Sequence, residues 1–232
     1  DDSCQSCQGR AEFDSPAAMT GLSLLAFLGA GHTHEREGPH QDPVRRAIDW
    51  LLARQEDSGD LRRGETMYSQ TVATVALCEA YAMTKDARLA DPARRAVAFV
   101  LDGRRADRQT AAGTSVIGWQ VMAVESARRA GILVADDTFA AAGAWLDSVA
   151  DRGSPGRYAY TRGQPPTPAM TAEAMFVQQL LGRTRDDPRM QQSADFILDT
   201  PPRWSNGAPT YYWYYATLAL FQHQGDGWST WN

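Results

Sequence analysis

Three segments of the chain begin with the same Asp-Pro step and continue in the same way. They read QDPVRRAIDWLL (41–52), ADPARRAVAFVL (90–101) and DDPRMQQSADFIL (186–198), and DDTFAAAGAWLDSV (136–149) is a fourth version without the proline. Asp is a favoured helix N-cap because its carboxylate accepts backbone N–H bonds, and proline fits the first helical turn, where its missing N–H would be unpaired anyway. We therefore expect helices to start at Asp42, Asp91, Asp137 and Asp187, which lie 46 to 50 residues apart.

Each of these segments carries an aromatic residue eight or nine positions after the aspartate: Trp50, Phe99, Trp145 and Phe196. Between the segments lie apolar, Ala-rich stretches: AAMTGLSLLAFLGAG, MYSQTVATVALCEAYAMT, TSVIGWQVMAVESARRAG, AMTAEAMFVQQLLG and YYWYYATLALFQ. Their apolar positions recur at helical spacing but cover much of the circumference, which is typical of helices buried on most sides. Buried and amphipathic helices therefore alternate along the chain.

This alternation predicts an all-α fold of stacked αα-hairpins with an inner and an outer helix layer. Strand signals are scarce, with no alternating β-branched runs and no Asn-Gly or Asp-Gly hairpin between such runs. Small residues in the inner segments favour a complete or incomplete ring, an α/α-toroid, over an open superhelix; they are Thr20, Gly21, Ala73, Thr74, Gly118 and Ala172. We expect residues 1–15 to be disordered or extended and 16–232 to form one domain, truncated in its last repeat because the final amphipathic helix is missing.

Composition excludes some functions. The chain has 232 residues, 43% hydrophobic and 22% charged, with a formal net charge of −5 and no basic face of the kind that nucleic-acid binding requires. No apolar run reaches the length of a membrane span. Three cysteines are too few for a disulfide framework and leave the compartment open. Cys4 and Cys7 form a C-x2-C without a second pair, and Cys78 is expected to be a small core residue.

The stretch WLLARQEDSGDL (50–61) resembles the repeat motif of the terpenoid cyclase and protein prenyltransferase α/α-toroid superfamily. That motif runs aromatic, Leu, three residues, Gln, three residues, Gly, one residue, Trp. Trp50, Leu51, Gln55 and Gly59 match it, and Leu61 replaces the final tryptophan. The five apolar stretches are similar to bacterial prenyltransferase and squalene oxidase repeat proteins, which are common in planctomycetes. The resemblance implies a structural role in which Gln55 ties neighbouring outer helices together and Gly59 ends a helix.

The catalytic motifs of that superfamily are not found in this chain. The Asp-x-Asp-Asp motif of squalene-hopene-type cyclases has only Val134-Ala135-Asp136-Asp137 as its nearest string, at an expected helix start. The Asp-x-Cys pair of the zinc-dependent prenyltransferases is replaced by Ala76-Leu77-Cys78, and the thioester run of complement-type toroids is missing. No cofactor and no metal site are therefore expected. His32, His34 and His40 could chelate a metal, but they lack a clear carboxylate partner, which favours ordinary loop residues.

Three glutamates are the candidate catalytic residues, because Glu79, Glu125 and Glu173 each interrupt an apolar inner segment. A buried glutamate needs a partner. One interpretation is a set of carboxylates that face a central cavity and perform acid–base chemistry, as in toroid glycosidases. The other is that they pair with Arg128, Arg129 or backbone groups at the rim.

Aromatic residues at the starts of inner segments are the candidate ligand-binding residues: Tyr68, Trp119, Tyr211, Tyr212 and Trp213. They are also suited to filling a core. Two functional hypotheses follow. The favoured one is a module without the known catalytic motifs, which binds an apolar, peptide or glycan ligand, or a partner, on its concave face. The alternative is a terpenoid-cyclase-like or carbohydrate-active enzyme. An incomplete ring would also expose an apolar face, which predicts self-association or packing with flanking regions.

Overall fold

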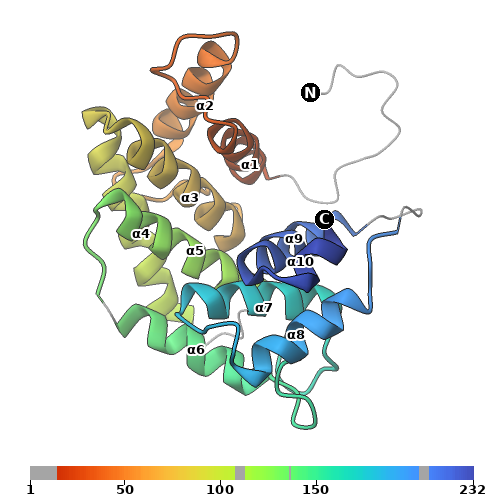
Figure 1. Ribbon diagram of the computed structural model, residues 1–232. Coiled ribbons are helices and arrows are strands. Elements are labelled where there is room, and N and C mark those ends of the chain that lie inside the picture. The colour runs from red at the N-terminus through yellow and green to blue at the C-terminus, as the bar shows by residue number, and fades with distance from the viewer. Residues whose placement is uncertain (1–14, 108–112, 136, 204–208) are drawn as a thin grey trace, which may run out of the picture.

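The computed structural model describes residues 15–107, 113–135, 137–203 and 209–232, which contain ten helices (Figure 1). The helices are α1 (Pro16–Gly29), α2 (Gln41–Arg54), α3 (Met67–Thr84), α4 (Ala87–Asp107), α5 (Thr114–Ala130), α6 (Asp137–Val149), α7 (Pro168–Leu180), α8 (Pro188–Leu198), α9 (Thr210–His223) and α10 (Asp226–Trp231). Apart from an isolated antiparallel bridge between Ala150 and Tyr158, these described residues form no β-structure. The prediction of an all-α fold is confirmed. The expectations for residues 1–15, Cys4, Cys7 and Asp136 fall almost wholly outside the described part.

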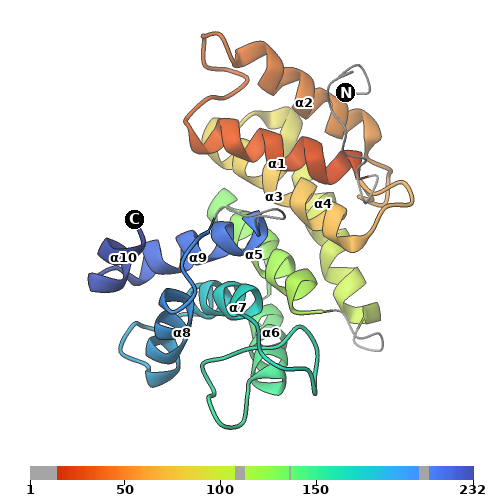
Figure 2. The same cartoon turned by 90° about the vertical axis from the view of Figure 1, so that its right-hand side faces the viewer.

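The helices lie in two layers. In the inner layer, α1, α3, α5, α7 and α9 each pack against the next, and Figure 1 shows them in chain order. In the view of Figure 2, α1 and α3 lie above α5 and α7. The outer helices α2, α4, α6 and α8 each pack on the inner helix that precedes them. Among the described helices, α1 and α9 do not form a closely packed pair, so the inner layer is an arc. This arrangement is compatible with part of an α/α-toroid.

Burial separates the two layers as the sequence pattern indicates. The inner helix α3 is buried at almost every position from Ser69 to Ala80. The outer helix α2 buries only Val44, Ile48 and Leu51, three or four residues apart, which is one helical face. Inner helices are therefore enclosed by neighbours on both sides and by the outer layer behind them.

Two inner glycines allow the close approach that small residues predict. A Cβ atom on Gly21 of α1 would lie 3.2 Å from the Ala73 backbone of α3. A Cβ atom on Gly118 of α5 would lie 2.1 Å from the Glu173 carboxylate of α7. A larger side chain would therefore collide with the backbone of α3 at Gly21 and with the buried Glu173 side chain at Gly118.

The expected helix starts are correct to within one residue at Asp42, Asp137 and Asp187 and wrong at Asp91. Asp187 caps α8 by accepting a hydrogen bond from the Arg189 N–H at 2.8 Å. Asp42 lies inside the first turn of α2, where it pairs with Arg45 and Arg46. The side chain of Asp137, at the start of α6, is outside the described part of the structure.

Asp91 and Pro92 lie within α4, which starts a full turn earlier than the Asp-Pro step predicts. Asp86 takes the capping role, because its Oδ1 accepts the Arg88 N–H at 2.9 Å. The added turn also buries Leu89 completely, in a core cluster that contains residues of α1, α2 and α3. These gains offset the one backbone hydrogen bond that Pro92 removes.

The loop that follows α2 contacts both α4 and α3, so it connects three helices. The Gln55 amide donates to the Pro92 carbonyl of α4 at 2.9 Å, so it ties two outer helices together as the family resemblance implies. Gly59 does not end a helix as predicted, because α2 already ends at Arg54 and Gly59 lies in the loop that follows. It has φ +91°, and a Cβ atom there would lie 2.2 Å from the Arg95 carbonyl oxygen. Leu61 is fully buried, and its N–H donates to Gln70 Oε1 of α3 at 2.7 Å.

The loop after α6 makes a second set of contacts of the same kind, which the sequence pattern does not predict. Gly156 lies against α8, where a Cβ atom would approach the Arg189 carbonyl oxygen to 2.3 Å. Two residues later, buried Tyr158 takes the place of Leu61, and its N–H donates to Thr171 of α7 at 3.0 Å. Ser193 of α8 adds a hydrogen bond to the Gly156 carbonyl at 2.6 Å.

The four aromatic residues of the repeat share one environment. Each carries an arginine guanidinium about 4–5.5 Å from its ring centre. The pairs are Trp50 with Arg54, Phe99 with Arg62, Trp145 with Arg162, and Phe196 with Arg157. The repeated aromatic therefore anchors loop or helix-end arginines on the outer layer and is not a core residue.

The chain continues beyond the last inner helix with α10, a six-residue helix that packs on α8 and α9. The sequence pattern does not predict this helix. Trp228 and Trp231 of α10 contact the core of the C-terminal hairpins. A short turn whose apolar residues are two tryptophans gives too little periodicity to indicate a helix.

We expect Gln55→Ala to lower the free energy of unfolding by about 1 kcal/mol, since it deletes the hydrogen bond between α2 and α4. For a domain of this size that corresponds to roughly 2–4 °C in melting temperature. Gln164→Ala is the matched control, because Gln164 is exposed in the loop before α7. Equal melting temperatures for the two variants would show that the Gln55 bond does not contribute to stability.

Candidate functional site

A cavity of about 420 Å³ opens on the inner face of the arc. All five inner helices contribute to its wall, and most of the lining residues lie in their C-terminal halves. The five helices therefore point the same way, as expected when each hairpin returns the chain to the same edge. The volume is in the range of small-molecule binding pockets, roughly 300–1,000 Å³.

The wall of the cavity is mainly apolar. Aliphatic, thioether and aromatic side chains from all five helices form it: Leu25, Leu28, Val75, Met83, Met122, Phe176, Leu180, Tyr214, Leu218 and Phe221. Several of them are open to solvent within the arc, with exposed fractions of 45% for Met83, 41% for Tyr214 and 55% for Phe221. Exposed apolar groups gathered in a concave surface are typical of a binding site.

The polar groups of the cavity come mainly from α3 and α5. Glu79 Oε1 accepts a hydrogen bond from the Ser126 hydroxyl at 2.6 Å. Glu125 pairs with Arg129 at 3.0 Å and with Arg128 at 3.7 Å. Two of the three predicted carboxylates thus line one cavity, and Glu125 has the arginine partners that the rim interpretation expects.

Glu173, the third predicted carboxylate, is not among the residues that line this cavity. It is completely buried between α5, α7 and α9, one helical turn before the cavity residue Phe176. The Tyr211 hydroxyl donates to its Oε2 at 2.9 Å, whereas Oε1 faces Gly118 and has no hydrogen-bond partner among the described residues. Burial raises the pKa of Glu173 to about 8, although hydrogen bonds from Tyr211 and Tyr215 partly oppose this shift. The carboxyl group is therefore neutral near pH 7.

Three of the five predicted ligand-binding aromatics gather around Glu173. Tyr68 and Trp119 meet edge to face with ring centres 5.6 Å apart, and Tyr211 lies 5.0 Å from Tyr215. Burial and the nearby Glu173 carboxyl raise the pKa of Tyr68. Tyr214, which stacks on Trp119, lines the cavity, whereas Tyr68, Trp119 and Tyr211 are not among its lining residues.

The other two predicted aromatics have different positions. Tyr212 is buried on the far side of α9, where its hydroxyl donates to the carbonyls of Ile197 and Thr200. Trp213 is partly buried against the C-terminal core. In the run of five aromatics, Tyr214 lines the cavity and fully buried Tyr215 packs against it, and neither is among the residues predicted from the sequence.

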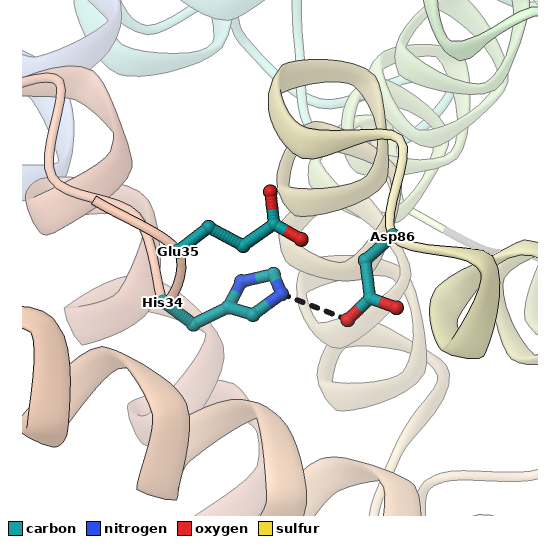
Figure 3. Close-up of side chains that lie close together, drawn as sticks. All are labelled: His34, Glu35 and Asp86. Atoms are coloured by element: carbon teal, nitrogen blue, oxygen red, sulfur yellow. Dashed lines mark hydrogen bonds and ion pairs between the residues drawn. The ribbon is translucent and has the colours of Figure 1, made fainter.

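His34 has a carboxylate partner, contrary to the expectation from the sequence. Its Nε2 lies 2.9 Å from Asp86 Oδ2, and Glu35 lies beside the imidazole ring, so one ligand atom from each residue falls within 4.8 Å of the others (Figure 3). Asp86 is also bound by Arg88 at 2.9 Å, and these hydrogen bonds hold its pKa at about 2 although burial opposes them. The cluster joins the loop after α1 to the start of α4, which accounts for it structurally.

The other two histidines also have structural contacts. His40 packs between His32 and Phe27, with ring centres 4.6 Å and 5.3 Å away.

Cys78 is fully buried, and burial raises the pKa of its thiol to about 12. It is the small core residue that the sequence predicts.

Comparisons of the chain with protein-family models, with curated proteins and with solved structures found no match. The geometry of the cavity is therefore the basis for the function proposed below. Within the described residues, no helix combines the length and the apolar character needed to cross a bilayer.

Proposed function

We propose that this protein is a helical-repeat module of the α/α-toroid kind that binds an apolar small molecule in the cavity of its inner layer. The observation that carries the proposal is that one cavity of about 420 Å³ is shared by all five inner helices and walled mainly by apolar side chains. Its solvent-exposed methionine and aromatic side chains would lose contact with water on binding. Each Å² of apolar surface removed from water is worth roughly 25 cal/mol.

A second candidate function is acid–base catalysis in the same cavity. Glu79 and Glu125 both line it, which is the arrangement that a carboxylate pair requires. Glu125 forms ion pairs with two arginines and Glu173 does not line the cavity, so Glu79 is the one lining carboxylate among the described residues without an ion-pair partner. Binding without the known catalytic motifs is therefore the function we favour.

Filling the cavity tests the proposal. We expect Leu218→Trp to weaken the binding of an uncharged apolar dye such as Nile red by about tenfold or more, because the larger ring occupies the ligand's space. Fluorescence titration measures this affinity. Leu133→Trp is the matched control, since Leu133 is 99% exposed and outside this cavity. If both variants bind the dye as the wild type does, the cavity is not the binding site.

A further inference from the structure

The mouth of the cavity is surrounded by the C-terminal ends of helices. One lining residue lies in the last turn of each inner helix: Gly29 of α1, Met83 of α3, Arg129 of α5, Leu180 of α7 and Gln222 of α9. A helix C-terminus carries about half a negative elementary charge, and the effect is confined to the last turn. Five such ends at one opening make a negative potential there and favour a positively charged group.

Side chains bring charges of both signs to the cavity, and the two signs lie at different places. The charged residues that line the cavity are Glu79, Glu125 and Arg129. Arg129 and Arg128 neutralise Glu125. Glu79 receives only the neutral Ser126 hydroxyl, and no described cation forms an ion pair with it. One carboxylate at the cavity is thus left without a cationic partner.

Arg128 and Arg129 lie in the last turn of α5, where Arg129 lines the cavity, and two further cations bind near these helix ends without reaching the cavity. Arg36 donates to the Gly31 carbonyl after α1 at 3.0 Å, and the Lys85 ammonium donates to the Ala130 carbonyl of α5 at 3.1 Å. Neither side chain is among those that line the cavity. The negative potential inside the mouth is therefore only partly offset.

A carboxylate at an apolar wall is poorly solvated and gains from a charged hydrogen-bond donor. The exposed rings of Tyr214 and Phe221 line the same space, and aromatic faces attract ammonium groups. We propose that the ligand of the cavity is a cationic amphiphile, an apolar body with an ammonium head group that binds at Glu79. This inference rests on the proposed function and narrows it to one class of ligand.

The contribution of the head group can be measured with three compounds that carry the same ten-carbon chain: decylamine, decanol and decanoate. Each is titrated into the protein by calorimetry below its micelle concentration. We expect the full chain to bind decylamine about tenfold more tightly than decanol, as for a hydrogen bond to a charged group. Decanoate should bind more weakly than decanol. The preference for decylamine should decrease as salt is added, because the mouth is open to solvent.

Glu79→Gln removes the charge and keeps an acceptor for the Ser126 hydroxyl. We expect this variant to bind decylamine and decanol with similar affinity and to bind decanol as the wild type does. Glu56→Gln is the matched control, because exposed Glu56 lies outside the cavity and the change in net charge is the same. The Glu56 variant should keep the tenfold preference.

The outcomes distinguish the two proposals. Similar binding of all three compounds by the wild type, or tighter binding of decanoate, overturns the cationic ligand and leaves the binding cavity intact. Binding of none of them contradicts both. If Glu79→Gln does not fold, as circular dichroism would show, the ranking of the three compounds on the wild type alone decides.

Discussion

Gly59→Ala is expected to destabilise the protein by at least about 3 kcal/mol, which is in the range of severe single substitutions. Two effects combine at this position. The left-handed φ of +91° is strained for any residue with a side chain, and the new Cβ would lie 2.2 Å from the Arg95 carbonyl oxygen. That oxygen belongs to the backbone of α4 and cannot rotate away. Thermal and urea unfolding measure the loss, which should lower the melting temperature by roughly 6–12 °C.

Substitutions at two other glycines measure the backbone strain and the steric overlap separately. Gly64 has φ +95° with open space around it, so Gly64→Ala should cost about 1 kcal/mol. Gly156 is not in the left-handed region, but its Cβ would lie 2.3 Å from the Arg189 carbonyl oxygen. Gly156→Ala should therefore cost more than Gly64→Ala and less than Gly59→Ala. Equal effects at Gly59 and Gly64 would mean that the contact with α4 is unimportant.

The loops after α2 and α6 show how far a motif can be followed in sequence. The first is visible because Trp50, Gln55 and Gly59 keep the spacing of the family motif. In the second, Gly156 lies eleven residues after Trp145, whereas Gly59 lies nine residues after Trp50. A two-residue insertion hides the motif from spacing but leaves the contact with the next outer helix unchanged.

The inner helices were predicted well because burial on most sides leaves a long apolar pattern. The Asp-Pro step was less reliable, since it locates a favourable start without excluding an earlier one. At α4 the cap is Asp86, and the additional turn depends on the burial of Leu89 in a core cluster that contains residues of three other helices. Contacts of this kind are absent from local sequence.

The candidate site was only partly predictable for the same reason. Helical periodicity brings Glu79 and Glu125 to the inner face, but only the packing of α5 on α7 covers Glu173. In the run of aromatics from Tyr211 to Tyr215, the residues that face the cavity depend on how α9 is rotated about its axis. Sequence pattern does not define that rotation when aromatic residues occupy every side.

Glu173 should make the stability of the protein fall as the pH rises. Its pKa is about 8 in the folded protein and 4.5 for an ordinary glutamate, because burial between α5 and α9 disfavours the charged form. Below pH 4.5 the carboxyl is neutral in both the folded and the unfolded state, and its contribution is fully present. Between pH 4.5 and about 8 the unfolded chain releases the proton and the folded protein keeps it, so stability is lost at up to about 1.4 kcal/mol per pH unit.

Glu173→Gln removes this titration, and the Tyr211 hydroxyl can still donate to the amide oxygen. We expect the variant to be less stable than the wild type at pH 5, because its amide N–H groups face Gly118 without an acceptor. At pH 9 the order should reverse, since the wild type must then ionise a buried carboxyl or keep its proton at a cost. Urea unfolding at several pH values gives the two slopes, with Glu56→Gln as the exposed control. Parallel slopes for the wild type and Glu173→Gln would show that the carboxyl ionises normally in the folded state, and therefore that α5, α7 and α9 do not enclose it.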